Sequence, residues 1–266
     1  MWISILVFLA SSVPSTLLFV WMFKRHKDDA EYTKSLKASL FAGLIAVLPI
    51  MVLSGTLFFI GKIIKSALNM NELLYQGLYT FIVLAAAEEI VKFVSFNIIL
   101  KKRKKSGYSW GDIVAFMVVI GNGFGLIESI LYAIGADPMT MIVRGLTLGH
   151  VGYAFIMGWF YGLGLKTGKT RYKVLSFVIP LLLHGAYDFS LTKELIDINE
   201  LFMLIPFALA ILDIVLLILV ARFFVRIKRK NIEKYNAPLF VVETNSNEQV
   251  QVVQDKEPEK ASEQDE

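Results

Sequence analysis

The chain has 266 residues, of which 56% are hydrophobic and 19% are charged, with a net charge of +4. Ordinary water-soluble domains are only about 45 to 50% apolar even when glycine is counted, and this chain exceeds that share without its glycines. Together with a mean hydropathy of +0.60, this excludes an ordinary water-soluble domain. The chain contains no cysteine, which excludes disulfide bonds, thiolate metal sites and thiol nucleophiles.

Long apolar stretches of about 20 residues, the length that a helix needs to cross a bilayer, follow one another along the chain. They run over residues 2–23, 36–60, 74–100, 112–134, 142–166, 173–192 and 201–225. We interpret the first as a retained helix and not as a secretory signal, because no Lys or Arg precedes it and its apolar character continues to Phe23. The sequence therefore predicts an all-α, polytopic membrane protein with about seven transmembrane helices.

Basic residues gather after every second apolar stretch, in residues 24–37, 101–105, 166–173 and 226–230. Because Lys and Arg collect in cytoplasmic loops, this pattern predicts an outside N-terminus and an inside C-terminus. The run from Lys101 to Lys105 is interpreted as an anchor of this topology and not as a nucleic-acid-binding patch. The expected partner of the chain is therefore the lipid bilayer, and no nucleic acid is expected.

The character of the chain changes near its end. The last 26 residues contain eight Asp or Glu, two Lys and no aromatic residue. Such a segment cannot bury enough apolar surface to offset the entropy lost on ordering. We expect a transmembrane helical domain over residues 1–230 and a disordered acidic cytoplasmic tail over residues 231–266.

Ionisable residues occur inside the apolar stretches, where a charge costs about 3 kcal/mol or more and usually marks a functional site. In chain order they are Glu88, Glu89, Lys92, Glu128, His150, His184, Asp188 and Asp213. By helical rise, four of them, Glu88, Glu128, His150 and His184, overlap in depth between the midplane and the outer leaflet, which predicts a shared cavity open to the outside. Asp213 is alone in its stretch, and we interpret it as a packing partner outside the site.

Helical spacing indicates which of these groups can meet. Lys92 lies three residues after Glu89 and four after Glu88, so either carboxylate can share a face with it. His184 and Asp188 are four residues apart and can contact each other in the same way. Adjacent Glu88 and Glu89 point about 100° apart on a helix, so we expect one to act in chemistry and the other to hold the geometry.

Glycine pairs four residues apart follow the same region, at Gly121 and Gly125, Gly145 and Gly149, and Gly158 and Gly162. Small residues at this spacing let membrane helices approach closely. They predict tight packing between the helices that carry Glu128 and His150.

Carboxylates and two imidazoles, without cysteine, are typical of a hydrolytic site that activates water. In one alternative, Glu128, His150 and His184 hold one zinc ion with an open position, and Glu88 is the general base. In the other, no metal is present, a buried glutamate activates the water, and His184 stabilises the oxyanion. The sequence alone leaves both alternatives open.

Several ordered motifs resemble the PrsW family of bacterial intramembrane proteases, which is related to the CAAX prenyl endopeptidases and bacterial self-immunity proteases. The motifs are E-E-x-x-K from Glu88 to Lys92, F-x-x-x-E from Phe124 to Glu128, and H-x-x-x-D from His184 to Asp188, with His150 between the last two. The resemblance covers residues 75–192. The chain departs from the CAAX pattern, in which Arg follows the Glu pair and His and Asn replace Glu128 and Asp188.

The resemblance implies an endopeptidase of the bacterial cell membrane that makes the first, extracytoplasmic cut in a single-span anti-sigma factor during a stress response. It implies catalytic roles for Glu88 and Glu89 with Lys92 beside them, and a site completed by Glu128, His150, His184 and Asp188. The buried charges also fit a second hypothesis, a proton- or ion-coupled transporter. The absence of an internal repeat speaks against transport.

Overall fold

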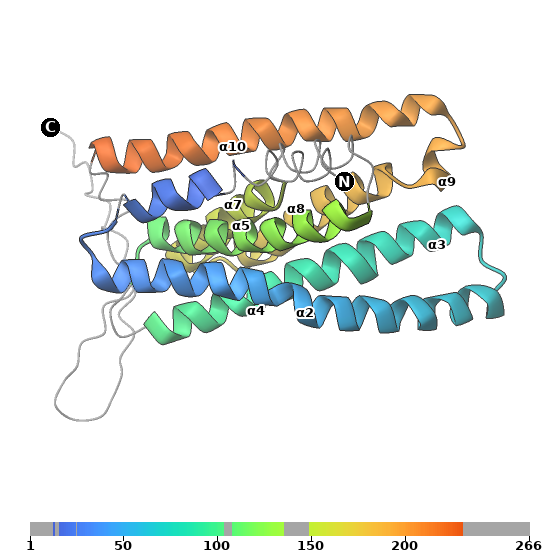
Figure 1. The fold of residues 1–266 in the computed structure, drawn as a ribbon, viewed down its shortest axis with the longest axis horizontal. Coiled ribbons are helices and arrows are strands. Elements are labelled where there is room, and N and C mark those ends of the chain that lie inside the picture. The colour runs from blue at the N-terminus through green and yellow to red at the C-terminus, as the bar shows by residue number, and fades with distance from the viewer. Residues whose placement is uncertain (1–12, 14–15, 25, 104–107, 136–148, 231–266) are drawn as a thin grey trace, which may run out of the picture.

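The computed structural model describes residues 13, 16–24, 26–103, 108–135 and 149–230, and within these ranges it contains helices and no strand (Figure 1). The predicted all-α fold is therefore confirmed for this part of the chain. Most of the first predicted stretch, the start of the fifth and the whole predicted tail over 231–266 lie outside the described residues.

Each predicted apolar stretch that is described lies on helical structure. The elements are α2 (Ala30–Ala67), α3 (Glu72–Leu78), the π-helical segment η1 (Tyr79–Ala85), α4 (Ala86–Arg103), α5 (Trp110–Gly135), α7 (Gly149–Thr167), α8 (Thr170–Ser190), α9 (Lys193–Ile196), the 3-10 turn η3 (Glu200–Met203) and α10 (Leu204–Lys230). The third stretch is thus one helix in three parts, with a π-helical segment directly before the turn that carries Glu88. Such segments occur frequently at functional sites.

Helix α5 forms the centre of the bundle (Figure 1). Residues 113–120 are all fully buried, and α5 packs against α2, α4 and α7. A helix that is apolar on all sides is stable only when it is surrounded. The surrounding helices supply core residues such as Leu36, Phe96 and Val151.

The outer surface of the bundle is apolar as well. Large side chains such as Phe41 and Phe59 on α2 and Leu204 and Ile211 on α10 are exposed. Helices α2, α5 and α10 are long and apolar enough to cross a membrane by length and composition. Exposing such an extended apolar surface to water is unfavourable, whereas contact with lipid is favourable. The fold is therefore that of a helical membrane protein.

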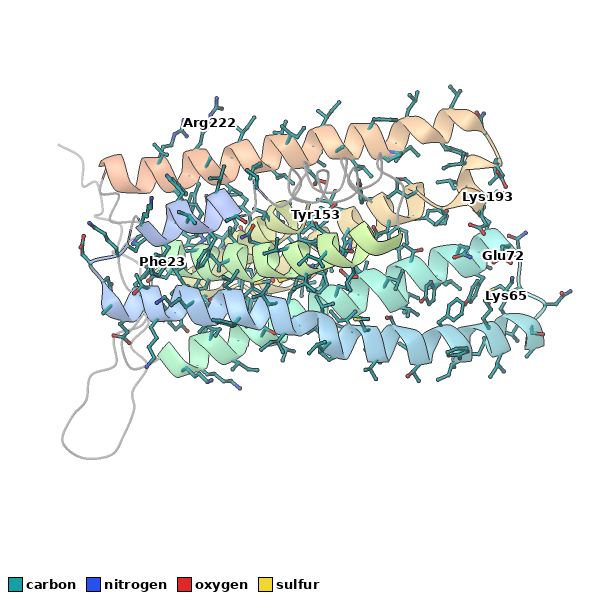
Figure 2. All side chains as sticks on the ribbon, in the orientation of Figure 1. Phe23, Lys65, Glu72, Tyr153, Lys193 and Arg222 are labelled. Atoms are coloured by element: carbon teal, nitrogen blue, oxygen red, sulfur yellow. The ribbon has the colours of Figure 1, made fainter. Side chains whose placement is uncertain are left out.

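Successive long helices run back and forth between two ends of the bundle. Figure 2 shows Lys65, Glu72 and Lys193 at one end and Phe23 at the other. An ion pair between Lys65 and Glu72 joins the end of α2 to α3, and α3 also packs against α9. The α2–α3 and α8–α9 connections therefore lie at the same end of the bundle.

Glycines hold α5 and α7 in close contact, as their spacing predicted. A Cβ at Gly121 would lie 2.4 Å from the carbonyl oxygen of His150, and one at Gly158 would lie 3.0 Å from Val114 Cα. Gly145 lies outside the described residues. Close approach of these backbones fixes the first turn of α7, which carries His150, against α5.

Gly43 on α2 offers a test of this packing, because a Cβ there would lie 2.2 Å from the backbone oxygen of Ile120. We expect Gly43→Ala to lower the free energy of unfolding by about 1 to 3 kcal/mol, since the α2 and α5 backbones must separate. Thermal unfolding in detergent measures this effect. Gly55→Ala on the same helix is the control: nothing lies within 4 Å of that position, so its melting temperature should be unchanged or higher. Equal melting temperatures for both variants would contradict the packing described.

Candidate active site

Ionisable side chains from four helices meet at one place in the bundle. They are Glu88, Glu89 and Lys92 from α4, Glu128 from α5, His150 from α7, and His184 and Asp188 from α8. All seven residues predicted from the sequence therefore lie together, although up to 95 positions separate the partners that touch.

Lys92 forms a fully buried ion pair with Glu89, with 2.6 Å between Nζ and Oε1. The same Nζ lies 3.1 Å from Nδ1 of His150 and 4.7 Å from the centre of the Phe124 ring. An ammonium group can only donate, so Nδ1 of His150 accepts a hydrogen bond from it. Lys92 therefore pairs with Glu89, one turn away, and links α4 to α5 and α7.

His184 is buried with acidic groups at both ring nitrogens. Its Nδ1 lies 2.9 Å from Glu89 Oε1, and its Nε2 lies 3.2 Å from Asp188 Oδ2 and 3.6 Å from Glu88 Oε2. The contact expected between His184 and Asp188 is therefore present. A carboxylate at Nδ1 fixes the orientation of an imidazole, as it does in many metal-binding histidines. Glu89 thus holds the ring and leaves Nε2 facing the other carboxylates.

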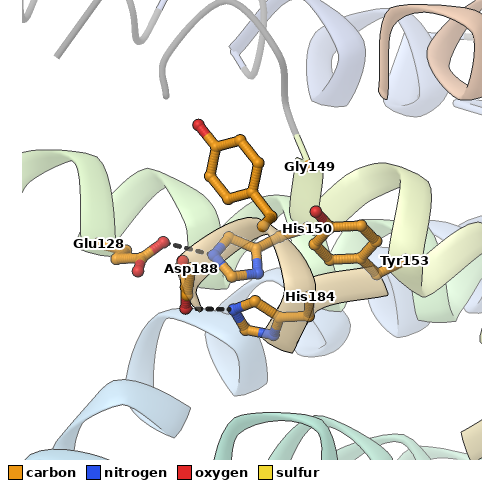
Figure 3. A pocket seen from close by; sticks show the side chains of 7 residues that line it. Glu128, Gly149, His150, Tyr153, His184 and Asp188 are labelled. Carbon is orange, nitrogen blue, oxygen red and sulfur yellow. Dashed lines mark hydrogen bonds and ion pairs between the residues drawn. The ribbon is translucent and has the colours of Figure 1, made fainter. Parts of the chain in front are cut away.

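His150 lies against His184, with the ring centres 5.0 Å apart and the planes nearly perpendicular. Its Nε2 is in contact with the carboxylate of Glu128. Since Nδ1 accepts from Lys92, Nε2 carries the proton that is donated to Glu128 in this arrangement. The two rings lie with Glu128 and Asp188 at a small pocket (Figure 3). The pocket is lined by Glu128, Gly149, His150, Tyr153, His184, Tyr187 and Asp188.

The site has the donor set of a metal centre. Glu88, His150 and His184 each offer one ligand atom, and these atoms all lie within 4.8 Å of one another. Glu88 Oε2 is buried and has no hydrogen-bond partner among the described residues. Carboxylates surround His184, while Lys92 is the one buried Lys or Arg side chain in the described part of the chain. A divalent metal ion would offset the charge of these acidic groups, so the residues fit such an ion.

Three further side chains lie at the site, and the sequence analysis assigned no functional role to them. The Tyr153 ring stacks on His184 at 5.3 Å, and Phe124 lies edge-on to His150 at 4.9 Å. Tyr153 follows His150 by three residues and Phe124 precedes Glu128 by four, so helical spacing could have placed both on the site face. The third is Asp213, on α10: its Oδ2 lies 3.0 Å from the position that a Cβ of Gly149 would take. No pattern in α10 pointed to this location.

The buried pair of Lys92 and Glu89 can be tested by its effect on stability. We expect Lys92→Met to lower the free energy of unfolding by about 3 to 5 kcal/mol, because it leaves Glu89 charged and without its cation in a buried site. Glu89→Gln should also lower the free energy of unfolding. The loss in the double variant should be smaller than the sum of the two single losses. Chemical unfolding in detergent measures all three. Lys193→Met is the control, because its pair with Asp197 is exposed. Simple additivity of the two buried changes would contradict the pairing.

Comparison with known proteins agrees with this geometry. A family model described as PrsW family intramembrane metalloprotease matches residues 31–220. Protease PrsW of Bacillus subtilis (strain 168) is 27% identical over 205 residues, which cover 74% of this chain and 87% of that protein. Protease PrsW of Geobacillus kaustophilus (strain HTA426) is 26% identical over 189 residues, covering 70% and 79%. Protease PrsW of Oceanobacillus iheyensis is 30% identical over 155 residues, covering 56% and 66%. No solved structure matches the chain. The chain belongs to the PrsW family of intramembrane metalloproteases.

Proposed function

We propose that this membrane protease cleaves its substrate in the pocket between α5, α7 and α8, with one zinc ion held by Glu88, His150 and His184. The observation that carries the proposal is the convergence of these three residues, from three helices, within 4.8 Å. Two histidines and one carboxylate with an open position form a known catalytic zinc arrangement. Imidazole donors suit zinc as well as copper, iron and nickel, and we propose zinc because it is the metal of the known hydrolytic sites with two histidines and one carboxylate.

The remaining charged residues would support this centre. A zinc ion at this place would activate a water molecule and polarise the scissile carbonyl group. Glu128 lines the pocket, and 16% of its side chain is exposed, more than for the other acidic groups of the site. We therefore assign to Glu128 the role of the general base, which accepts a proton from the water molecule. Glu89 orients His184, and Lys92 balances the charge of Glu89. Asp188 faces Nε2 of His184.

The sequence had suggested the opposite roles, with Glu128 as a ligand and Glu88 as the base. In the structure Glu128 contacts His150, whereas Glu88 Oε2 faces His184 and belongs to the compact ligand group. This difference favours Glu88 as the ligand. A metal-free site, with glutamate alone activating water, is the third arrangement to be tested.

Metal analysis of purified variants separates these arrangements. We expect about one zinc per unmutated chain and loss of both zinc and cleavage in His150→Ala, His184→Ala and Glu88→Gln. Glu128→Gln should keep its zinc and cleave at least about 100-fold more slowly, since removal of a general base typically costs this much. Asp197→Asn, which changes an exposed residue of the α8–α10 connection, is the control. Zinc retained by Glu88→Gln without cleavage would instead make Glu88 the base, and cleavage in strong chelator would exclude the metal.

We also propose the finer topology that the loops predict: about seven spans, an outside N-terminus, a protease domain over 1–230 and a cytoplasmic tail over 231–266. Support comes from Lys65 and Lys193, which lie at the same end of the bundle, away from Phe23 (Figure 2). The relatives are bacterial proteins, which supports a place in a bacterial cell membrane. The resemblance to PrsW proteases supports a single-span anti-sigma factor as the substrate, cut first on the outer side.

Single cysteines can test this topology, because the chain has none of its own. Lys193 and Lys169 are both exposed and lie in connections on either side of α8. We expect a membrane-impermeant maleimide to label Lys193→Cys in intact cells and Lys169→Cys only after the membrane is opened. Labelling in the reverse order would invert the topology, and labelling of both in intact cells would show that α8 does not span.

A further inference from the structure

Tyr153 and Asp213 form a buried pair that the proposed chemistry does not use. Tyr153 lies on α7 and Asp213 on α10, with 3% and 2% of their surfaces exposed. A side-chain hydrogen bond joins them, in which the Tyr153 hydroxyl donates to the carboxyl group of Asp213. An acidic side chain inside a membrane helix is costly and usually marks a function. The pair is therefore expected to do more than fill space.

Close packing between α7 and α10 sets the position of this pair. A Cβ at Gly149 would lie 3.0 Å from Asp213 Oδ2 and 3.3 Å from the Tyr153 hydroxyl. A Cβ at Gly152 would lie 3.1 Å from the side chain of Leu216, one turn after Asp213. Glycines at both positions let α10 come this close to α7. The carboxyl group is thus held in place by the packing of the helices, and it holds the Tyr153 hydroxyl in turn.

The ring of Tyr153 covers one face of His184. The two ring centres are 5.3 Å apart and the planes are inclined by 22°, so the rings are stacked. Glu89 contacts the same imidazole in another way, at Nδ1. A single hydrogen bond at Nδ1 directs the ring but lets it tilt about that bond, whereas a second ring stacked on its face opposes the tilt. The two contacts together define the orientation of the imidazole.

We propose that Tyr153 is a positioning residue for His184, and that Asp213 acts on His184 through the Tyr153 hydroxyl. The stacked ring keeps Nε2 of His184 directed toward Asp188 and Glu88, whose oxygens lie 3.2 and 3.6 Å away. Groups of a site are held precisely when their neighbours are themselves fixed by packing and hydrogen bonds. This inference rests on the proposed function and deepens it, since α10, which supplies none of the proposed ligands, thereby helps to hold one of them.

Histidine NMR of the metal-free protein in detergent tests the orientation of His184 without cleavage. The chain has three histidines, so isotope-labelled histidine gives few signals, and the variants His150→Ala and His184→Ala assign them. We expect Tyr153→Leu to move the His184 ring protons downfield, because they lose the ring current of the stacked side chain. Asp213→Ala should cause a smaller change, since the Tyr153 ring remains but is less well held. The signals of His26 should stay the same in both variants.

Zinc affinity, measured by competition with a chelator, tests the consequence for the proposed ligand. We expect Tyr153→Leu to weaken zinc binding about 10- to 100-fold, the usual loss when a group that orients a metal ligand is removed. Tyr153→Phe and Asp213→Ala should each cause a smaller loss. Their double variant should lose no more than either alone, because both changes remove the same hydrogen bond.

Tyr161→Leu is the matched control for these measurements. Tyr161 is also on α7, packs against Phe93 and Phe96 of α4 and donates a hydrogen bond to Asn97, away from the candidate ligands. Its replacement should lower the free energy of unfolding and leave zinc affinity unchanged.

Two results would overturn the proposal: His184 signals that are the same with and without Tyr153→Leu, or losses from Tyr153→Phe and Asp213→Ala that add in the double variant. Equal losses of zinc affinity in Tyr153→Leu and Tyr161→Leu would also overturn it, since general loosening of the bundle would explain both. If Tyr153→Leu does not fold, the double-variant comparison decides. Failure of the proposed function shows differently, as unmutated protein that binds no zinc, and the histidine signals then decide whether Tyr153 orients His184.

Discussion

The arrangement of the site depends on one buried charge, the ammonium group of Lys92. It lies among Glu89, His150 and the face of Phe124, with no exposure to solvent. In a medium of low polarity, the carboxylates around His184 would repel one another without a cation nearby. By pairing with Glu89, Lys92 fixes the carboxylate that in turn holds Nδ1 of His184. One cation thus connects α4, α5, α7 and α8.

The surplus of acidic groups beyond this pair gives the site its chemical character. Glu88, Glu128 and Asp188 gather around the two imidazoles, and a pocket opens beside them. A relay for protons or ions would use the same residue types, but membership of a metalloprotease family favours hydrolysis over transport. Tight glycine packing between α5 and α7 holds these groups in place under the apolar outer surface.

Much of the fold follows from apolar length and helical period alone. Those signals predicted the long described helices and the contact between His184 and Asp188, because both depend on positions close in the sequence. They could not decide whether Glu88 or Glu89 pairs with Lys92, since both spacings are allowed and tertiary packing decides. They also could not predict the π-helical segment over Tyr79–Ala85. Tyr153 and Asp213 were missed because an aromatic residue or a lone acid in an apolar helix is usually a packing residue.

X-ray absorption at the zinc edge of the purified, unmutated protein tests the central claim most directly. A centre built from Glu88, His150 and His184 predicts first-shell scattering from nitrogen and oxygen only, with the outer-shell pattern of two imidazoles. His184→Ala should lose that pattern together with most of the zinc. An active protein that contains no stoichiometric metal, or a zinc shell without imidazole, would contradict the assignment.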